Sequence, residues 1–87
     1  MLNNKVVLIT GGTGSFGTAF VKFIFQKYKK IKKLIIFSRD EFKQYEMKKT
    51  FAEPKYKCMR YFLGDVRDLD RLNLAFKDVD IVIHAAA

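Results

Sequence analysis

Four glycines near the N-terminus have the spacing of a loop that holds a phosphate group. The segment Thr10-Gly11-Gly12-Thr13-Gly14-Ser15-Phe16-Gly17 contains both Gly12-x-Gly14-x-x-Gly17 and Gly11-x-x-Gly14-x-x-Gly17. Such glycines allow a tight turn, close approach of the backbone to a pyrophosphate and close packing of a helix on a strand. The amide groups that begin the helix then face the anion. Thr18 stands where a phosphate-hydrolysing loop carries lysine, which disfavours that class.

A second set of polar residues follows an apolar run about 20 residues after the glycine loop. A dinucleotide-binding unit carries its ribose-recognising residue at this position. NAD-binding units have Asp or Glu there, whereas this chain has Ser38 and Arg39. A guanidinium binds a 2′-phosphate through charge-assisted, often bidentate hydrogen bonds, so the sequence favours NADP over NAD. The alternative is that Ser38 is only a helix N-cap, that Arg39 is an exposed charge, and that Asp40 or Glu41 reaches a ribose.

Two further candidate binding segments follow apolar runs nearer the C-terminus. In Gly64-Asp65-Val66-Arg67-Asp68, the Asp65 carboxylate can accept a hydrogen bond from an adenine amine, and the backbone after it can contact the ring. The alternative is a common turn in which Asp68 caps a helix. The chain ends in His84-Ala85-Ala86-Ala87, whose small side chains would let a cofactor lie against the backbone. His84 is the only histidine and is assigned no proton-transfer role, because a lone histidine at a strand end is more often structural.

Strands alternating with helices must position these groups. Runs of β-branched and aromatic residues predict strands at residues 5–10, 33–38, 59–64 and 80–84, and the continuous apolar character of the first two suits strands covered on both faces. Helices are predicted after the glycine loop and at 40–51 and 68–76, with Pro54 as a stop signal after the second. This alternation is typical of a parallel sheet with right-handed crossovers. We therefore expect an α/β fold, a Rossmann-type parallel sheet with strand order 3-2-1-4, incomplete at four strands.

Two local details of the helices are also predicted. Apolar residues of the first helix recur at the spacing of one helical face, namely Phe16, Ala19, Phe20, Phe23 and Ile24. We expect this face to pack on the sheet. Val21 and Phe25 widen the apolar surface, which predicts a second cover from further chain or from another subunit. Ser38 and Glu41 have the capping-box spacing that would begin the second helix.

Composition excludes several classes of protein. With 87 residues there is room for one domain at most, and 49% hydrophobic with 30% charged residues is an ordinary globular composition. The apolar runs are far shorter than the roughly 20 residues of a membrane span. The single cysteine, Cys58, excludes an intrachain disulfide and a thiolate metal cluster, so we expect no metal site and a cytoplasmic location.

The formal net charge of +8 raises nucleic acid as a partner. Much of the excess lies at the end of the first predicted helix, where cations complement the helix dipole, in Lys27, Lys29, Lys30, Lys32 and Lys33. These lysines do not alternate with exposed aromatic residues as a stacking platform requires. We therefore expect no nucleic-acid partner and keep a basic nucleic-acid-binding module as the weaker alternative.

Four motifs have now been described, at residues 10–17, 38–41, 64–68 and 84–87. In this order and spacing they resemble the N-terminal part of the extended short-chain dehydrogenase/reductase family. The resemblance covers all 87 residues and is nearest to the inverting UDP-N-acetylglucosamine 4,6-dehydratases of bacterial polysaccharide and flagellin-sugar synthesis. It implies NADP as cofactor, with residues 13–16 at the pyrophosphate, 38–43 at the 2′-phosphate region, 65 and 66 at the adenine, and Ala85 at the ribose next to the nicotinamide. The candidate cofactor-binding residues are Gly11, Thr13, Gly14, Ser15, Phe16, Gly17, Ser38, Arg39, Asp40, Lys43, Asp65, Val66, Ala85 and Ala86.

The resemblance also implies the reaction. In the family, NADP+ takes a hydride from C4 of the sugar, a base removes the C5 proton, water leaves C6 and the hydride returns to C6. The Tyr-x-x-x-Lys pair that acts as the base in the oxidation of C4 belongs on a helix after a fifth strand. Tyr45 with Lys49 and Tyr28 with Lys32 are therefore chance matches, and no catalytic residue is assigned.

The chain is therefore expected to be the N-terminal part of a dinucleotide-binding domain, inactive alone and weak in binding NADP or unable to fold by itself. The full-length protein is expected to use a UDP-sugar and to be a homo-oligomer. The alternative within the family is a nucleotide-sugar epimerase or reductase.

Overall fold

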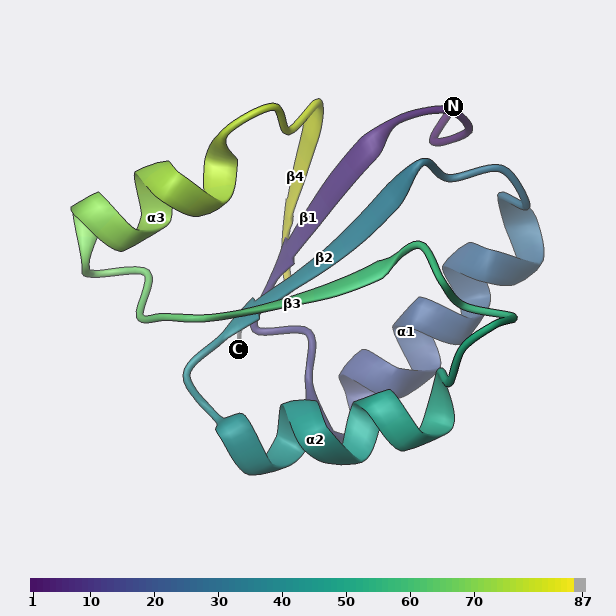
Figure 1. Ribbon diagram of the computed structural model, residues 1–87, viewed down its shortest axis with the longest axis horizontal. Helices are drawn as coiled ribbons and strands as arrows, with labels where there is room; N and C mark the ends of the chain where they lie inside the picture. Colours follow the sequence, from purple (N-terminus) through teal and green to yellow (C-terminus); the bar gives the residue numbers. More distant parts are fainter. Residues whose placement is uncertain (86–87) are drawn as a thin grey trace.

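A computed structural model describes residues 1–85, which form one parallel sheet with helices on both faces. The strands are β1 (Val6–Thr10), β2 (Lys33–Ser38), β3 (Met59–Leu63) and β4 (Ile81–His84), in the order β3-β2-β1-β4. Helices α1 (Gly14–Lys27) and α2 (Glu41–Thr50) lie on one side of the sheet and α3 (Leu69–Phe76) on the other (Figure 1). The predicted fold class and strand order are confirmed, and the strand bounds agree to within one residue.

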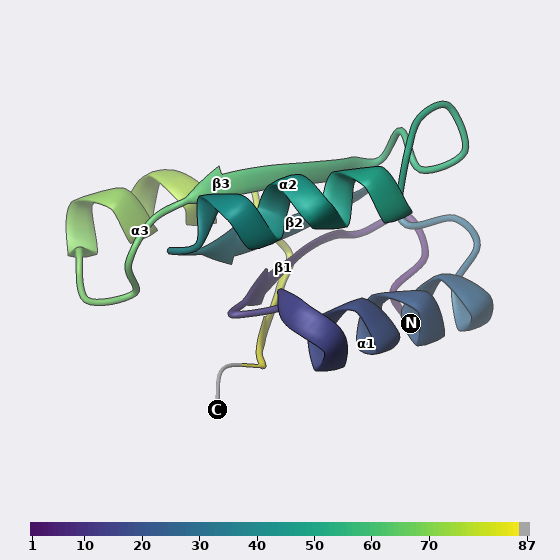
Figure 2. The same ribbon diagram turned by 90° about the horizontal axis from the view of Figure 1, so that it is seen from below.

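Alternating residues of the two central strands supply two apolar cores. Val7, Ile9 and Leu34 pack with α1 and α2, which lie side by side in Figure 2. Leu8 and Phe37 point to the other face, toward α3. These strand residues are fully buried because a helical layer covers each face of a parallel sheet.

Helix α1 packs on the sheet through a different face from the one predicted. Its buried residues are Gly17, Val21 and Ile24, whereas Phe16 is 69% and Phe23 56% exposed. Ala19 is also exposed, Phe20 is partly buried, and only Ile24 of the predicted face is fully inside. The prediction was wrong because both sides of this helix are apolar, so the 3.6-residue period did not distinguish them. Close packing of Gly17 on the glycine loop decides the rotation of the helix.

The predicted external cover over Val21 and Phe25 was also wrong. Val21 lies inside the core. Phe25 is covered by its own chain, with its ring 5.1 Å from that of Tyr56 and 6.3 Å from that of Phe51 between centroids. The aromatic side chains that α1 leaves exposed are instead Phe16 and Phe23.

Helix α2 begins two residues later than the capping-box spacing predicted. Asp40 is its N-cap, and the Asp40 carboxylate accepts a hydrogen bond from the Lys43 amide at 2.9 Å. Ser38 is instead the last residue of β2, where it pairs with Leu63. This pairing keeps Ser38 in extended backbone, so the next carboxylate takes over the cap. Asp68 caps α3 and accepts from the Arg71 amide, which agrees with the alternative interpretation of its segment.

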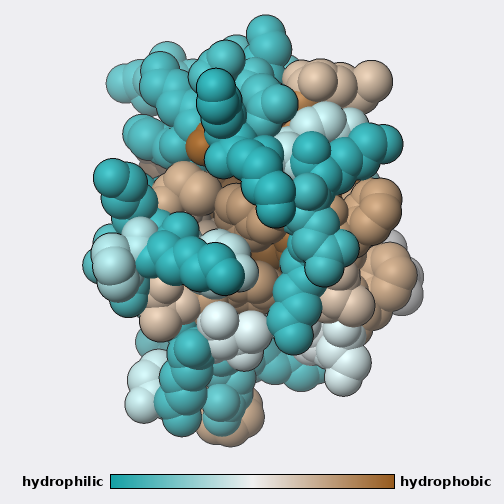
Figure 3. Space-filling view, turned by 90° about the vertical axis from the view of Figure 1, so that its right-hand side faces the viewer, coloured by the Kyte–Doolittle hydropathy of each residue, from teal (hydrophilic) through white to brown (hydrophobic). Residues whose placement is uncertain are grey.

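The lysines around the end of α1 are all exposed, as solvated charges should be. On the face that shows this end of the molecule, hydrophilic side chains surround a central apolar area (Figure 3). Among the described residues, no helix combines the length and the apolar character that crossing a lipid bilayer requires.

Replacing Tyr61 with phenylalanine should stabilise the fold by up to about 1 kcal/mol, because a buried polar atom without a partner costs free energy. The hydroxyl of Tyr61 in β3 is buried and makes no hydrogen bond with any of the described residues, and burial raises the pKa of Tyr61 to about 12. Urea unfolding followed by circular dichroism would measure the change. The matched control is Tyr45→Phe, since Tyr45 is 57% exposed and its hydroxyl is free to meet water. A loss of stability in Tyr61→Phe alone would contradict the prediction.

Candidate functional site

The glycine loop joins the end of β1 to the start of α1, and its glycines serve separate tasks. Gly11 adopts a left-handed backbone with φ of 69°, and its amide donates to the Phe37 carbonyl at 2.8 Å. Gly14 has φ of 82° at the first position of α1, with open space around its Cα. A Cβ on Gly17 would lie 2.1 Å from the Gly12 carbonyl oxygen, so only glycine allows this contact between loop and helix.

The loop leaves the beginning of α1 open to an anion. Thr13 is the N-cap residue, and its side chain makes no capping hydrogen bond. No acidic residue lies in the first turn. Because the first amide groups of a helix have no partner within it, they carry partial positive charge toward whatever lies before them. Nothing lies within 4 Å of a Cβ built on Gly14, so a ligand can approach the backbone at the start of α1. An accessible helix N-terminus of this kind is a common binding place for phosphate groups.

A pocket of about 400 Å³ lies where the loops after β1, β2 and β3 converge. Parallel neighbouring strands all end at one edge of the sheet, so residues far apart in sequence meet there. The predicted residues that line the pocket are Gly11, Thr13, Ser38, Arg39, Asp40, Lys43, Asp65 and Val66. Three residues outside the prediction also line it, namely Phe37, Gly64 and Arg67.

The remaining predicted residues lie around this pocket. Gly14 and Ser15 line a neighbouring hollow between α1 and α2, and Lys43 borders both. The Phe16 side chain is exposed, and Gly17 is buried beneath the loop. The Ala85 amide donates to the Thr10 carbonyl at 3.0 Å, which extends the pairing of β4 with β1 past His84. The prediction for Ala86 falls outside the described residues.

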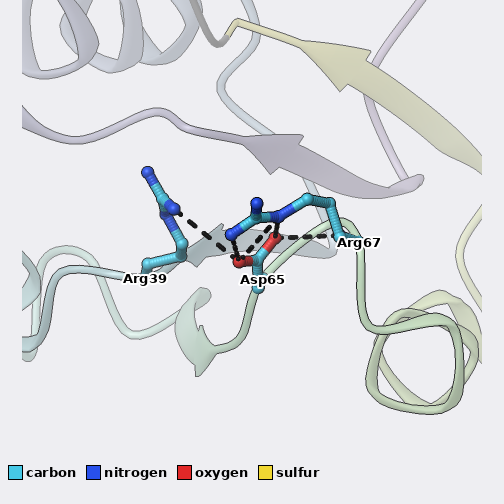
Figure 4. Close-up of polar contacts among 3 residues, drawn as sticks. All are labelled: Arg39, Asp65 and Arg67. Carbon is cyan, nitrogen blue, oxygen red and sulfur yellow. Dashed lines mark hydrogen bonds and ion pairs between the residues drawn. The ribbon is translucent and has the colours of Figure 1, made fainter.

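Two arginines meet at Asp65 in the pocket wall (Figure 4). The Arg67 guanidinium donates to both carboxylate oxygens, with its shortest contact 2.7 Å from Nη2 to Oδ2, and the Arg67 amide donates to Oδ1 at 2.9 Å. Arg39 Nη1 lies 3.7 Å from Oδ2. The hydrogen bonds from Arg67, with a smaller contribution from the charge of Arg39, hold the pKa of Asp65 well below its usual range. Asp65 is therefore an ionised acceptor at neutral pH.

Sequence reasoning missed Gln44, which positions Ser38. Gln44 is 4% exposed in α2, and its Nε2 donates to Ser38 Oγ at 2.9 Å and to the Phe62 carbonyl at 3.2 Å. This side chain ties α2 to β2 and β3 beneath the pocket. No sequence signal marked it, since a glutamine in a polar helix is usually exposed. Arg67 was visible in the motif, but its position beside Arg39 depends on the pairing of β2 with β3.

Replacing Gln44 with leucine should destabilise the fold by about 2 kcal/mol, because the Ser38 hydroxyl and the Phe62 carbonyl lose a buried donor. Urea unfolding of the two proteins would measure the difference. Gln26→Leu is the matched control, since Gln26 is exposed on α1 and should shift stability by less than about 0.5 kcal/mol. Equal effects at the two positions would show that the buried hydrogen bonds contribute nothing.

Other candidate chemistry is limited. His84 Nδ1 and Thr10 Oγ1 share a hydrogen bond between the paired ends of β4 and β1. Tyr45 and Lys49 are exposed on α2, with the Lys49 ammonium 4.6 Å from the Tyr45 ring centroid. Within residues 1–85, His, Cys, Asp and Glu side chains form no cluster of three or more that could hold a metal ion.

Comparisons with known proteins agree with this geometry. A family model described as "Polysaccharide biosynthesis protein" matches residues 7–87. The chain is 59% identical over 87 residues to a UDP-N-acetylglucosamine 4,6-dehydratase (inverting) of Campylobacter jejuni. It is 47% identical over 89 aligned residues to a UDP-glucose 4-epimerase of Rickettsia bellii. Each match covers 100% of this chain and 25% of the relative, so the chain spans about a quarter of the length of these proteins.

Solved structures show the same arrangement of strands and helices. Pen from Bacillus thuringiensis superposes with a TM-score of 0.86 at 37% identity, covering 99% of this chain and 26% of that one. A dTDP-glucose 4,6-dehydratase from Bacillus anthracis, solved in complex with NAD, superposes with a TM-score of 0.77 at 24% identity, covering 95% and 27%. At that identity the second likeness supports the fold alone.

Proposed function

The chain belongs to the polysaccharide biosynthesis protein family, within the extended short-chain dehydrogenase/reductases, and from this premise we propose that it forms the NADP-binding part of a UDP-N-acetylglucosamine 4,6-dehydratase. The observation that carries the proposal is the convergence of three strand-end loops on one pocket, with the glycine loop leading into the N-terminus of α1. The 59% identity to a relative of that name favours this activity over the epimerase.

We assign the pyrophosphate to the glycine loop and the first turn of α1. Amide groups of residues 13–16 would donate to its oxygens, while Gly11 and Gly17 hold the turn and the close packing that aim them. The exposed Phe16 side chain is compatible with a role for its backbone alone. This part of the site needs no metal, because the helix N-terminus itself offers the positive potential.

We assign the adenosine half to the loops after β2 and β3. Ser38, Arg39 and Lys43 would bind the 2′-phosphate, with Asp40 beside them as the cap of α2. Asp65 would accept from the adenine amine, and the Val66 backbone would contact the ring. The shared pocket supports this assignment, since the loops after β2 and β3 border the same space as the glycine loop after β1.

The nicotinamide end lies toward β4 in this proposal. The small side chains of Ala85, directly after β4, and of Ala86 would leave room for the ribose next to the nicotinamide. When bound, the cofactor supplies the transient hydride transfer between C4 and C6 that a 4,6-dehydratase needs. We further propose a UDP-sugar substrate, a homo-oligomeric full-length protein and a cytoplasmic location.

Incubation of the full-length protein with UDP-N-acetylglucosamine and NADP+ tests the function. A dehydratase yields a product lighter by one water, whereas an epimerase yields a product of unchanged mass, so mass spectrometry of the nucleotide sugar separates the two. Calorimetric titration with NADP+ tests the cofactor site independently of turnover. Absence of dinucleotide binding to the folded protein would refute the whole proposal, and binding with an unchanged sugar mass would refute only the dehydration.

A further inference from the structure

Besides Arg39, the pocket contains a second arginine, Arg67, which strand pairing brings next to Arg39. Arg39 follows β2 and Arg67 follows β3, and the pairing of these strands brings both guanidinium groups to one carboxylate. Figure 4 shows the two side chains approaching Asp65 from different loops. The side chains of Arg39 and Arg67 are 70% and 78% exposed, so packing locks neither of them in place.

Arg67 contacts both oxygens of the Asp65 carboxylate in this arrangement. A carboxylate accepts about four hydrogen bonds. Oδ1 accepts from the Arg67 amide and from Arg67 Nε at 2.9 and 3.1 Å, and Oδ2 accepts from Nη2 and Nε at 2.7 and 3.2 Å, with Arg39 nearby. The Nε hydrogen is shared between the two oxygens, so three N–H groups of Arg67 fill most of the acceptor capacity of the carboxylate. An adenine amine would therefore compete with the Arg67 guanidinium for these oxygens.

The positive and negative side chains of the pocket nearly balance in number. Its charged side chains are Arg39, Lys43 and Arg67 against Asp40 and Asp65. Asp65 pairs with the Arg67 guanidinium, whereas Asp40 accepts from the backbone amide of Lys43 and not from its ammonium group. With Arg67 held in this way, Arg39 and Lys43 would meet a 2′-phosphate dianion next to an ionised carboxylate. A second guanidinium at the phosphate would offset the repulsion between that carboxylate and the phosphate.

We propose that Arg67 is a specificity-determining residue that moves from Asp65 to the 2′-phosphate when the dinucleotide binds, where it acts together with Arg39. Asp65 then has an oxygen free for the adenine amine. The exchange replaces charge-assisted hydrogen bonds with others of the same kind, so it leaves neither charged group without a partner. The inference rests on the proposed function and deepens it, because it assigns the preference for a 2′-phosphorylated cofactor to two arginines from different strands.

Calorimetric titration of the full-length protein with NADP+ and with NAD+ tests the proposal. We expect Arg67→Ala to weaken NADP+ binding about tenfold and NAD+ binding less than about threefold. Arg67→Lys should fall between wild type and Arg67→Ala for NADP+, since it keeps the charge and loses the fork. The matched control is Arg60→Ala, because exposed Arg60 lies outside the pocket and, among residues 1–85, donates only to the Lys57 and Met59 carbonyls.

The combined Arg39→Ala and Arg67→Ala variant adds a coupling test. If both side chains bind the same phosphate, the effects of the two substitutions on NADP+ affinity should not be additive. Their small effects on NAD+ affinity should be additive. Circular dichroism would verify that each variant is folded. If Arg67→Ala does not fold, the affinities of Arg67→Lys are compared with those of the wild type instead.

Each other outcome has a definite meaning. Tighter binding of both cofactors by Arg67→Ala would show that Arg67 only blocks Asp65, and unchanged affinities would show that it touches neither ligand. Both results overturn the role of Arg67 while the proposed function stands, because wild type still binds the cofactor. Failure of the wild-type protein to bind either dinucleotide removes the proposed function and this inference together.

Discussion

Replacing Gly17 with alanine should destabilise the fold by at least about 3 kcal/mol, although alanine is the better helix former by about 1 kcal/mol. The added Cβ would lie 2.1 Å from the Gly12 carbonyl oxygen and 2.2 Å from its carbon. These are backbone atoms of the turn itself, so no side-chain rotation can relieve the clash. Either α1 moves off the sheet or the loop changes shape, and both also remove the anion cradle.

Gly14→Ala is the matched control for Gly17→Ala. Nothing lies within 4 Å of a Cβ at Gly14, but its φ of 82° is strained for alanine, and we expect a cost of about 1 kcal/mol. Urea unfolding of both variants, followed by circular dichroism, would rank them. If Gly17→Ala were as stable as wild type, the close contact between loop and helix would not exist, and the rotation assigned to α1 would be wrong.

Replacing Arg39 with alanine should weaken NADP+ binding by about 30-fold, while NAD+ affinity changes by less than about threefold. The difference arises because the guanidinium can make bidentate, charge-assisted hydrogen bonds only to a 2′-phosphate. Arg39 borders the pocket, and its side chain is 70% exposed, so its removal should leave the core intact. Calorimetric titration of the full-length protein with each dinucleotide measures both affinities.

Arg39→Lys separates charge from geometry in the same experiment. The lysine variant should retain part of the NADP+ affinity and lose more of it as salt concentration rises, since a single exposed charge is readily screened. Equal losses of NADP+ and NAD+ affinity in Arg39→Ala would remove the basis for preferring NADP. Wild-type preference for NAD+ would point instead to Asp40 or Glu41 at the ribose, the alternative that the sequence left open.

The sheet and much of the site followed from local sequence. Runs of β-branched and aromatic residues predicted all four strands, and the apolar character of the first two is continuous because a helical layer covers each face of the sheet there. The expected strand order is confirmed. The glycine spacing predicted the turn into α1, and Asp68 was identified as a cap from its own segment. Ser38, Arg39 and Asp65 could be grouped in advance because parallel strands place their carboxyl ends at one edge.

Other features depended on contacts between distant segments. The rotation of α1 follows from the packing of Gly17 on Gly12, and no periodicity within an apolar helix could reveal it. Pairing of Ser38 with Leu63 in β3 extended β2 and moved the helix cap to Asp40. Hydrophobic pattern and turn chemistry are properties of one stretch of chain, so the sequence alone determined the elements. The partner of a carboxylate or the buried side of a helix depends on which other stretch lies against it, and only the tertiary structure decided those.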